Sequence, residues 1–474
     1  MNARLFLLTA TIAASVFAAD KATMPNRTDR SAETLGWRLG VQAWSFNQFT
    51  FFDAVDKAQA LGLKYIEMFP GQSVGGAMPD ATTEFTMDQA TRDAIKKKLA
   101  DAGITLVNYG VVTPESDKDW SNLFAFARAM GIETIVSEPP ADQLPRLDQL
   151  CRTAHVKLAI HNHPAPSRYW APETVLAAVS NCSPLIGASA DTGHWVRSGR
   201  EPRACLDLLG RRVLGFHLKD LNKAAPDAHD VPWGTGVNNV WGILADLKAR
   251  GYRGTFSIEY EHNWDNSMPD IARCIEYFDL AAAALNDEGF APLFSPDLKN
   301  AVIEPGGWAV KDGVLSPADN GDIWSRASFG DFILDLEFKT EKDSNSGVFL
   351  RTGDITNWLH TAIEVQILQP TVPNTRENCG GIFDVLAPAK NAIKPAGEWN
   401  RYVIMARGSR IFVVLNGEQV TAIDLDQWTK AHTNPDGTPN KFDTAYKDMP
   451  RKGALGLQYH GSKVWFRNLR VKQL

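Results

Sequence analysis

Hydrophobic and polar positions divide the chain into two parts with different patterns. From about residue 36, short apolar runs alternate with longer amphipathic runs whose apolar residues recur at helical spacing. Such alternation predicts strands that are each followed by a helix. The runs predicted as strands are residues 39–44, 65–69, 105–109, 134–138, 157–163, 186–191, 213–219 and 255–261.

The amphipathic runs predict helices over residues 52–61, 92–102, 123–130 and 240–250, each followed directly by a glycine. Glycine accepts the left-handed conformation that often ends a helix. Eight strands alternating with helices over about 250 residues match the usual size of a (β/α)8 TIM barrel. An open doubly wound sheet is the competing architecture. It usually carries a glycine-rich phosphate loop after its first strand, which the segment 43–46 does not resemble.

Beyond about residue 285 the helical spacing mostly disappears and short alternating runs replace it. Turn signals such as Asn416-Gly417 separate these runs, which is typical of an all-β sandwich or jelly roll. We therefore place an α/β barrel over residues 36–285 and an all-β domain over residues 290–474. The predicted strands of the second domain are 332–339, 347–351, 362–368, 402–407, 411–415, 455–459 and 464–471.

Length and charge agree with a two-domain exported protein. A chain of 474 residues is too long for one core, and its formal net charge of −6 gives no reason to expect nucleic acid as a partner. Arg4 followed by the apolar run 5–17 predicts a signal peptide over residues 1–19 and a periplasmic location, with a buried N-terminal helix as the alternative. No other run is long and apolar enough to predict a transmembrane segment.

Polar residues end several of the predicted barrel strands, where the reactive groups of such barrels collect. Alternation within the seventh strand turns His217 and Lys219 toward the barrel axis, and the eighth strand does the same with Glu259 and Glu261. The other polar residues at strand ends are Glu67, Glu138, His161, His163 and Asp191.

So many ionisable groups at one rim are costly to desolvate unless a cation neutralises them. The predicted ligands are Glu138, Asp191, His217 and Glu259, with His163 in reserve. A mixed imidazole and carboxylate set suits Mn²⁺, Zn²⁺, Co²⁺ or Fe²⁺ better than Ca²⁺. The alternative is that the histidines are structural and that the carboxylates cap the following helices.

Three motifs resemble the xylose-isomerase-like superfamily of sugar isomerases, epimerases and dehydratases over residues 36–285. They are Ala190-Asp191-Thr192-Gly193-His194-Trp195, His217-Leu218-Lys219-Asp220 and Ile258-Glu259-Tyr260-Glu261. The resemblance implies that Asp191, His217 and Glu259 bind metal and that His194 contacts the substrate. The fifth strand departs from the isomerases, which commonly supply a Glu ligand where this chain has His161-Asn162-His163.

The second domain resembles the 3-keto-disaccharide hydrolase family, also described as 3-keto-α-glucoside-1,2-lyase/3-keto-2-hydroxy-glucal hydratase, over residues 290–474. The resemblance implies a fold similar to a concanavalin-like jelly-roll sandwich. It rests on the motifs Gly347-Val348-Phe349-Leu350-Arg351-Thr352, Glu364-Val365-Gln366-Ile367-Leu368, Gly397-Glu398-Trp399-Asn400, Leu415-Asn416-Gly417, Gly456-Leu457-Gln458-Tyr459-His460-Gly461 and Phe466-Arg467-Asn468-Leu469.

Alternation within residues 362–368 places Glu364 and Gln366 on the face opposite an apolar row that belongs in a core. Arg351 ends the neighbouring strand, where it could bind an oxyanion or pair with Glu364. The structural alternative is a cross-strand ion pair without further function. Asp384 and His460 are further polar candidates.

The two resemblances imply one reaction on 3-keto-glycosides. A ketone at C3 acidifies the hydrogen on C2, so a base removes it, the C1 substituent leaves by β-elimination, and hydration of the glucal completes a net hydrolysis. A metal at the barrel mouth polarises the ketone, and His161, His194 and Lys219 move protons, whereas Glu364 and Arg351 act in the second domain. Two divisions of labour stay open: one domain performs elimination and the other hydration, or each domain acts on a different linkage. The predicted substrate contacts are Trp44, Glu67, His163, Glu261, Gln366, Asp384 and His460.

The sequence contains no nucleotide-binding fingerprint, so we expect no nucleotide cofactor and a separate 3-dehydrogenase upstream. Two alternatives remain open at this point. One is a sugar isomerase or epimerase barrel with a non-catalytic carbohydrate-binding C-terminal domain. The other is a secreted scaffold or sugar-binding protein without activity.

Overall fold

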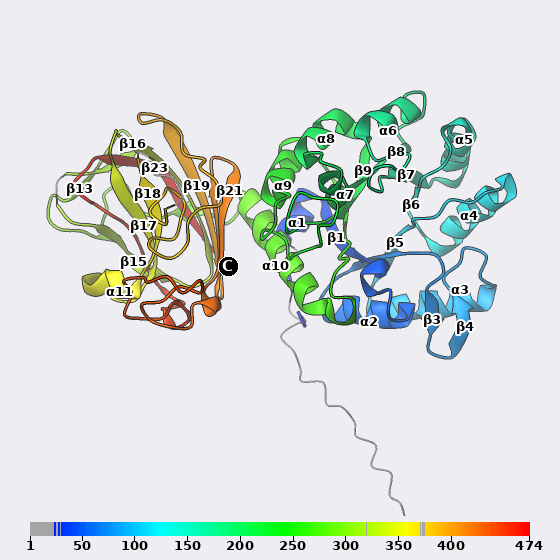
Figure 1. The fold of residues 1–474 in the computed structure, drawn as a ribbon, viewed down its shortest axis with the longest axis horizontal. Helices are drawn as coiled ribbons and strands as arrows, with labels where there is room; N and C mark the ends of the chain where they lie inside the picture. Colours follow the sequence, from blue (N-terminus) through cyan, green and yellow to red (C-terminus); the bar gives the residue numbers. More distant parts are fainter. Residues whose placement is uncertain (1–22, 25–26, 29, 319, 370, 372–374) are drawn as a thin grey trace, which may run out of the picture.

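The computed structural model describes residues 23–474 except 25–26, 29, 319, 370 and 372–374. The predicted signal peptide over residues 1–19 lies outside the described residues. Figure 1 shows two bodies side by side, a barrel ringed by helices and a sandwich of strands. Within the described ranges, no helix has both the length and the apolar character needed to cross a bilayer.

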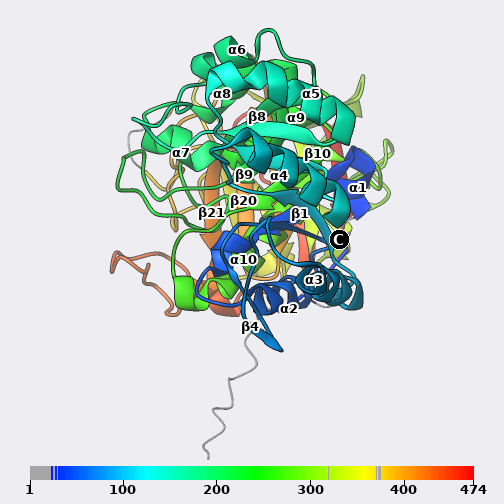
Figure 2. The same cartoon turned by 90° about the vertical axis from the view of Figure 1, so that its right-hand side faces the viewer.

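Eight parallel strands close into a barrel, as the alternating pattern predicted. Hydrophobic side chains of these strands pack outward against the helices, which surround the strands in Figure 2. Around the barrel the strands are β1 (Trp37–Gln42), β10 (Gly254–Ile258), β9 (Val213–Leu218), β8 (Ile186–Asp191), β7 (Lys157–His161), β6 (Thr134–Ser137), β5 (Thr105–Tyr109) and β2 (Tyr65–Met68).

Capping residues fix the ends of several helices around the barrel. The helix predicted over 92–102 starts earlier, at Gln89, because the side chain of Asp88 accepts a hydrogen bond from the backbone of Thr91. Gly103 and Gly131 end their helices with φ of 68° and 76°. The helices are α1 (Arg30–Leu35), α2 (Phe51–Ala60), α3 (Gln89–Ala102), α4 (Asp117–Met130), α5 (Leu144–Ala154), α6 (Pro172–Val179), α7 (Thr192–Arg197), α8 (Pro202–Leu209), α9 (Val240–Ala249) and α10 (Met268–Leu285).

Two local features differ from the sequence prediction. The first strand ends at Gln42, because its side chain accepts a hydrogen bond from the backbone of Trp44 and starts a 3-10 turn over Ala43–Phe46. A short hairpin of β3 (Ser73–Gly75) and β4 (Met78–Thr82) follows the C-terminal end of β2.

The second domain is an all-β sandwich, as predicted. An eight-stranded sheet contains β13 (Trp308–Lys311), β14 (Val314–Pro317), β23 (Val464–Gln473), β16 (Phe332–Thr340), β19 (Trp399–Arg407), β20 (Arg410–Leu415) and β21 (Glu418–Asp424), with β11 (Ala291–Pro292) beside β23. A five-stranded sheet contains β12 (Ala301–Val302), β15 (Ile323–Phe329), β22 (Gly453–Leu457), β17 (Asn345–Thr352) and β18 (Ile363–Leu368). The short helix α11 (Trp358–Thr361) precedes β18.

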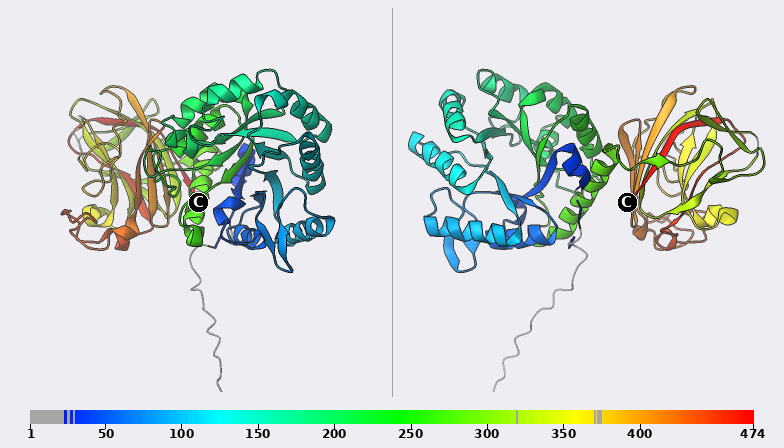
Figure 3. Two further views of the ribbon diagram at one scale, coloured as in Figure 1. Left: turned by 45° about the vertical axis from the view of Figure 1, so that its right-hand side comes forward. Right: turned by 180° about the vertical axis from the view of Figure 1, so that it is seen from behind.

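The eight-stranded sheet lies between the barrel and the five-stranded sheet (Figure 3). Its outer face packs on the barrel helices through Ile333, Val403, Met405, Phe412 and Val414. Its inner face shares a core with the predicted apolar row of β18, which consists of Ile363, Val365 and Ile367. The opposite face of β18, with Glu364 and Gln366, therefore points away from the barrel.

Candidate active site

A cavity of about 350 Å³ opens at the C-terminal ends of the barrel strands. This is the end at which (β/α)8 barrels place their reactive groups. Three histidines and two glutamates line it beside aromatic and backbone atoms. The lining residues are Gln42, Trp44, Phe69, Pro70, Gly110, Val111, His161, His163, His194, Glu259 and Glu261.

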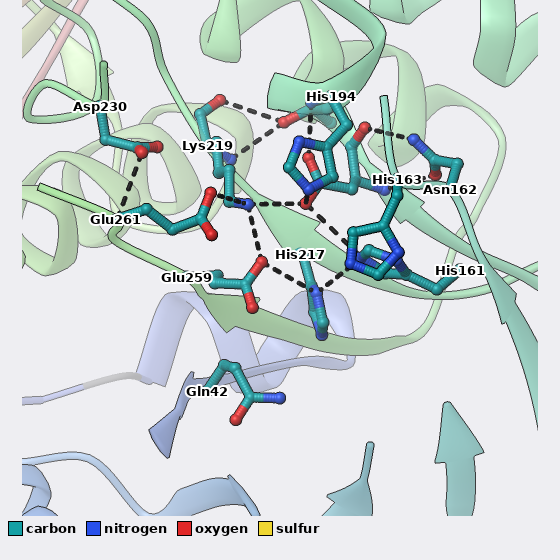
Figure 4. Close-up of polar contacts among 12 residues, drawn as sticks. Gln42, His161, Asn162, His163, His194, His217, Lys219, Asp230, Glu259 and Glu261 are labelled. Atoms are coloured by element: carbon teal, nitrogen blue, oxygen red, sulfur yellow. Dashed lines mark hydrogen bonds and ion pairs between the residues drawn. The ribbon is translucent and has the colours of Figure 1, made fainter. Parts of the chain in front are cut away.

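A buried cluster of His161, Asp191, His217 and Glu259 lies at this cavity. Each residue offers one ligand atom, and these atoms all lie within 4.8 Å of one another. The residues come from the ends of β7, β8, β9 and β10, so four neighbouring strands converge on one point (Figure 4). The cluster could hold a metal ion.

The carboxylate of Glu67 orients the imidazole of His217 from the side opposite the cluster. Its Oε1 lies 2.8 Å from His217 Nε2, and its Oε2 accepts a hydrogen bond of 2.6 Å from the hydroxyl of Ser257. With its Nε2 proton donated to Glu67, His217 would turn the Nδ1 lone pair toward the cluster, where Glu259 Oε2 lies 3.2 Å away. A carboxylate behind a histidine ligand is the usual outer partner of a metal site. Glu67, predicted as a substrate contact, is instead buried beneath the cluster.

Glu138 has the same relation to His161. Its Oε1 lies 3.4 Å from His161 Nδ1 and also contacts the ring of His163. Burial alone would raise the pKa of Glu138, but the hydrogen bonds with His161 and His163 hold that pKa well below its usual range. The ionised Glu138 thus favours a proton on Nδ1 of His161 and directs Nε2 into the cluster.

The donor set fits a divalent transition metal. The Nε2 of His161 and the Nδ1 of His217 face each other at 3.2 Å. The other nitrogen of each ring faces a carboxylate that accepts a hydrogen bond from its N–H. Two lone pairs that converge in this way are satisfied by a cation. With the carboxylates of Asp191 and Glu259 the set contains two nitrogen and two oxygen ligands, which suits Mn²⁺, Zn²⁺, Co²⁺ or Fe²⁺.

Lys219 adds a buried positive charge next to these ligands. Its Nζ lies 2.8 Å from Asp191 Oδ2, 2.7 Å from Glu259 Oε2 and 2.8 Å from Glu261 Oε2. Burial would lower the pKa of Lys219, but the three carboxylates hold it well above its ordinary value. Lys219 therefore carries its proton and acts through charge and hydrogen bonding.

His194 lies at the cavity wall in α7. Arg197 Nη1 lies 3.1 Å from His194 Nδ1, and because an arginine only donates, the ring proton lies on Nε2. Burial, together with the charge of Lys219, holds the pKa of His194 well below its usual range. A neutral His194 thus keeps its proton on Nε2, which lies 3.5 Å from Asp191 Oδ2 at the cavity wall.

The other predicted contacts of the barrel lie at the rim. Trp44 is 40% exposed and packs edge to face on Phe69, with ring centroids 5.0 Å apart. Glu261 accepts hydrogen bonds from Lys219 and from Arg197, the latter at 2.9 Å.

Of the four predicted metal ligands, three lie in the buried cluster. The fourth position of the cluster belongs to His161, while Glu138 groups with His161 and His163.

A second candidate site surrounds Glu364 on the outer face of the five-stranded sheet. Its side chain is buried and lies over Gly347, where a Cβ atom would come within 2.1 Å of the Glu364 carboxylate. Burial, and then the charge of Asp322, raises the pKa of Glu364 to about 8, while Lys441 acts in the opposite direction. A carboxyl group with a pKa near neutral is typical of an acid or base in catalysis.

Several buried polar atoms near Glu364 have no hydrogen-bond partner among the described residues. They are the Oε1 atoms of Gln366 and Gln458 and the hydroxyl of Tyr446. The pKa of Tyr446 is raised by burial and then by Glu364 and Asp384, which places both carboxylates near its hydroxyl. Unsatisfied buried polar groups are rare and mark places where a ligand or water binds.

The predicted pairing of Arg351 with Glu364 is wrong. Phe349, not Arg351, lies opposite Glu364, and a bulge follows in the pairing of β17 with β22. Arg351 has a φ of 51°, and its buried guanidinium donates to the carbonyl of Gly330 at 2.8 Å and pairs with Asp331 at 3.2 Å. It therefore joins loops of the sandwich instead of facing the polar row. His460 is exposed, and its electrostatic effect lowers the pKa of Asp322. It is therefore linked to the site around Glu364 only indirectly, through Asp322.

Comparison with known proteins assigns both halves of the chain. Residues 55–278 match the family described as xylose isomerase-like TIM barrel, and residues 290–472 match the 3-keto-alpha-glucoside-1,2-lyase-like domain. The two matches cover successive parts of the chain. The chain is 27% identical over 206 residues to a protein of Bacteroides thetaiotaomicron named 3-keto-disaccharide hydrolase, covering 36% of this chain and 71% of that protein.

Several solved structures are similar to parts of this chain. A protein of Parabacteroides distasonis, assigned provisionally as a glycosyl hydrolase, is 35% identical with a TM-score of 0.38 and covers 39% of this chain and 99% of its own. An uncharacterized protein of the same organism is 31% identical with a TM-score of 0.44, covering 51% and 98%. A xylose isomerase-like TIM barrel protein of Mycobacterium smegmatis in complex with magnesium is 15% identical with a TM-score of 0.45, covering 52% and 97%.

Proposed function

We propose that this protein hydrolyses 3-keto-glycosides in two steps at two sites. The lyase-like domain cleaves the glycoside by β-elimination, and the barrel hydrates the resulting 3-keto-2-hydroxy-glucal. The observation that carries the proposal is the buried Glu364, whose pKa is about 8, among polar atoms that lack partners. The family description of this domain and the name of its Bacteroides thetaiotaomicron relative support the choice of reaction.

In the first step Glu364 acts as the base. A ketone at C3 makes the C2 hydrogen acidic, so the Glu364 carboxylate takes that proton and the electron pair forms the C1–C2 double bond. The bond between C1 and the glycosidic oxygen breaks, and the departing alcohol takes up a proton. A carboxylate whose pKa is near 8 is a stronger base than an ordinary one and is still partly ionised at neutral pH.

In the second step water adds to C1 of the glucal in the barrel. The electron pair of the double bond moves toward the C3 oxygen, and a proton then returns to C2, which yields the 3-keto sugar. A divalent cation held by His161, Asp191, His217 and Glu259 would stabilise the negative charge on the sugar oxygens. The Lys219 ammonium offers further positive charge, and the Nε2 proton of His194 serves for proton transfer.

The proposed reaction depends on another enzyme for its substrate. Because no group in the reaction oxidises C3, a separate 3-dehydrogenase must supply the keto substrate, and no nucleotide cofactor is needed here. With the signal peptide predicted over residues 1–19, we place the reaction in the periplasm.

Substrate comparison tests the proposal. The protein is expected to cleave 3-keto-trehalose and 3-keto-sucrose and to leave trehalose and sucrose intact, because only the ketone acidifies C2. Product chromatography of the four incubations measures this. Cleavage of the unoxidised sugars at a similar rate would contradict β-elimination and point to a conventional glycosidase.

A further inference from the structure

The lyase-like domain touches the barrel at a segment that leads into the barrel site. This segment, residues 219–239, connects β9 to α9 and begins with Lys219. The strand β21, at the edge of the eight-stranded sheet, contacts the start of α9 (Figure 1). Two adjacent side chains of β21, Glu418 and Gln419, make the polar contacts.

Gln419 binds two parts of the barrel at once. Its Nε2 donates a hydrogen bond to the carbonyl of Gly234, and its Oε1 accepts one from the hydroxyl of Tyr277 in α10. Gly234 has a φ of 82°, and a Cβ atom there would come within 2.1 Å of the Tyr277 ring. The backbone of Gly234 is thus pressed between Tyr277 and Gln419, and only glycine fits this position.

Glu418 holds the far end of the same segment. Its carboxylate accepts hydrogen bonds from Asn239 at 3.1 Å and from Arg203 at 3.0 Å. Asn239 caps α9 by accepting from the backbone N–H of Gly242 at 3.1 Å. Both ends of the stretch 234–239 are therefore fixed by the lyase-like domain.

Inside the barrel, Asp220 turns this stretch into a compact loop. Its buried carboxylate accepts four backbone hydrogen bonds, from Leu221, Gly234, Gly236 and Asn238. Asn238 Nδ2 then donates to the carbonyl of Lys219 at 2.9 Å. A continuous set of hydrogen bonds thus runs from Gln419 to the backbone of Lys219, whose ammonium bridges three carboxylates at the barrel site (Figure 4).

We infer that Gln419 of the lyase-like domain is a positioning residue for the barrel site, acting through Gly234 and Asp220 on Lys219. The second domain is then part of the frame that holds the barrel's reactive end, in addition to carrying its own site. The inference concerns the barrel's geometry and rests on the proposed function only for the turnover measurement.

The test replaces Gln419 by methionine, which keeps the volume and removes both hydrogen bonds. In the full-length protein, the amides of Gly234, Gly236 and Asn238 are expected to exchange with deuterium about 10-fold faster, because their loop opens more often. The kcat for hydration of the glucal should fall about 10-fold with KM within twofold of the wild type, because a displaced Lys219 affects charge stabilisation more than binding.

The matched control is Lys472→Met. Lys472 of β23 also joins the two domains, through hydrogen bonds of 2.6 and 2.7 Å to the carbonyls of Ala283 and Asn286, but these carbonyls lie at the C-terminal end of α10, outside segment 219–239. Its variant should show wild-type exchange of that segment and wild-type kcat. Unchanged exchange in Gln419→Met, or the same acceleration in Lys472→Met, would overturn the inference. If the wild type does not hydrate the glucal, the proposed function fails while the exchange comparison still decides this point.

Discussion

Replacing His217 with alanine is expected to lower the affinity for Mn²⁺ or Zn²⁺ by roughly 100-fold or more and to stop hydration of the glucal. His217 contributes Nδ1 to the cluster, and its loss also removes one partner of the buried Glu67. Cleavage of the 3-keto-glycoside should continue, so the 3-keto-2-hydroxy-glucal accumulates. Isothermal titration with metal and product chromatography measure the two effects.

Two further variants give this experiment an intermediate effect and a control. Glu67→Gln keeps the ligand but weakens its orientation, and a loss of about 10-fold in metal affinity is expected. His155→Asn changes an exposed histidine at the end of α5, two residues before β7 and at the opposite end of the barrel strands, and should bind metal as the wild type does. Wild-type metal affinity in the His217 variant would refute the assignment of the cluster.

The second large effect concerns Glu364→Gln, which is expected to slow cleavage of the 3-keto-glycoside by about 1,000-fold. The amide keeps the shape of the side chain but cannot accept the C2 proton. In the wild type, kcat/KM for cleavage should rise with pH and level off above about 8, because the base must be ionised and its pKa is raised to about 8 by burial. Rate profiles between pH 5 and 10 measure this dependence.

Because Glu364 lies on the sheet face that points away from the barrel, we expect the intermediate to pass through solution. A mixture of the Glu364 and His217 variants should therefore convert the 3-keto-glycoside completely, although each variant alone stops at one step. A mixture that remains blocked would mean that the intermediate is not released. An inactive Glu364 variant that also fails to hydrate added glucal would instead indicate a folding defect.

The repeated alternation of strand and helix was sufficient to predict the barrel, because its period is set by local geometry. The same alternation correctly turned His217 and Lys219 inward, since neighbouring residues of a strand point to opposite faces. It also placed the apolar row of β18 in the sandwich core. The alternation along a strand therefore predicts on which face of the strand a residue lies.

The pattern does not supply the distance between residues of different strands. Glu138 follows directly after β6 and Glu259 directly after β10, yet only Glu259 lies in the cluster, and Glu138 reaches the histidines from outside it. His161 ends its own strand and points directly into the cluster. Only the tilt and stagger of the closed barrel decide between them.

The surroundings of Glu364 were beyond sequence reasoning for a different reason. Asp322 and Tyr446 come from loops far apart in the chain, and no local period connects them to β18. The error over Arg351 has a local cause, a bulge in β17 combined with a positive φ that turned its side chain away. Positive φ at a non-glycine residue is uncommon and cannot be inferred from alternation.

The central claim is that cleavage and hydration occur at separate sites and that only hydration needs the metal. The most direct test incubates 3-keto-trehalose with protein stripped of metal by EDTA and follows the glucal and the 3-keto sugar over time. The account predicts that cleavage continues, that the glucal accumulates, and that added Mn²⁺ or Zn²⁺ restores its hydration. Equal amounts of 3-keto sugar with and without metal, or isomerised sugar without any cleavage, would contradict it.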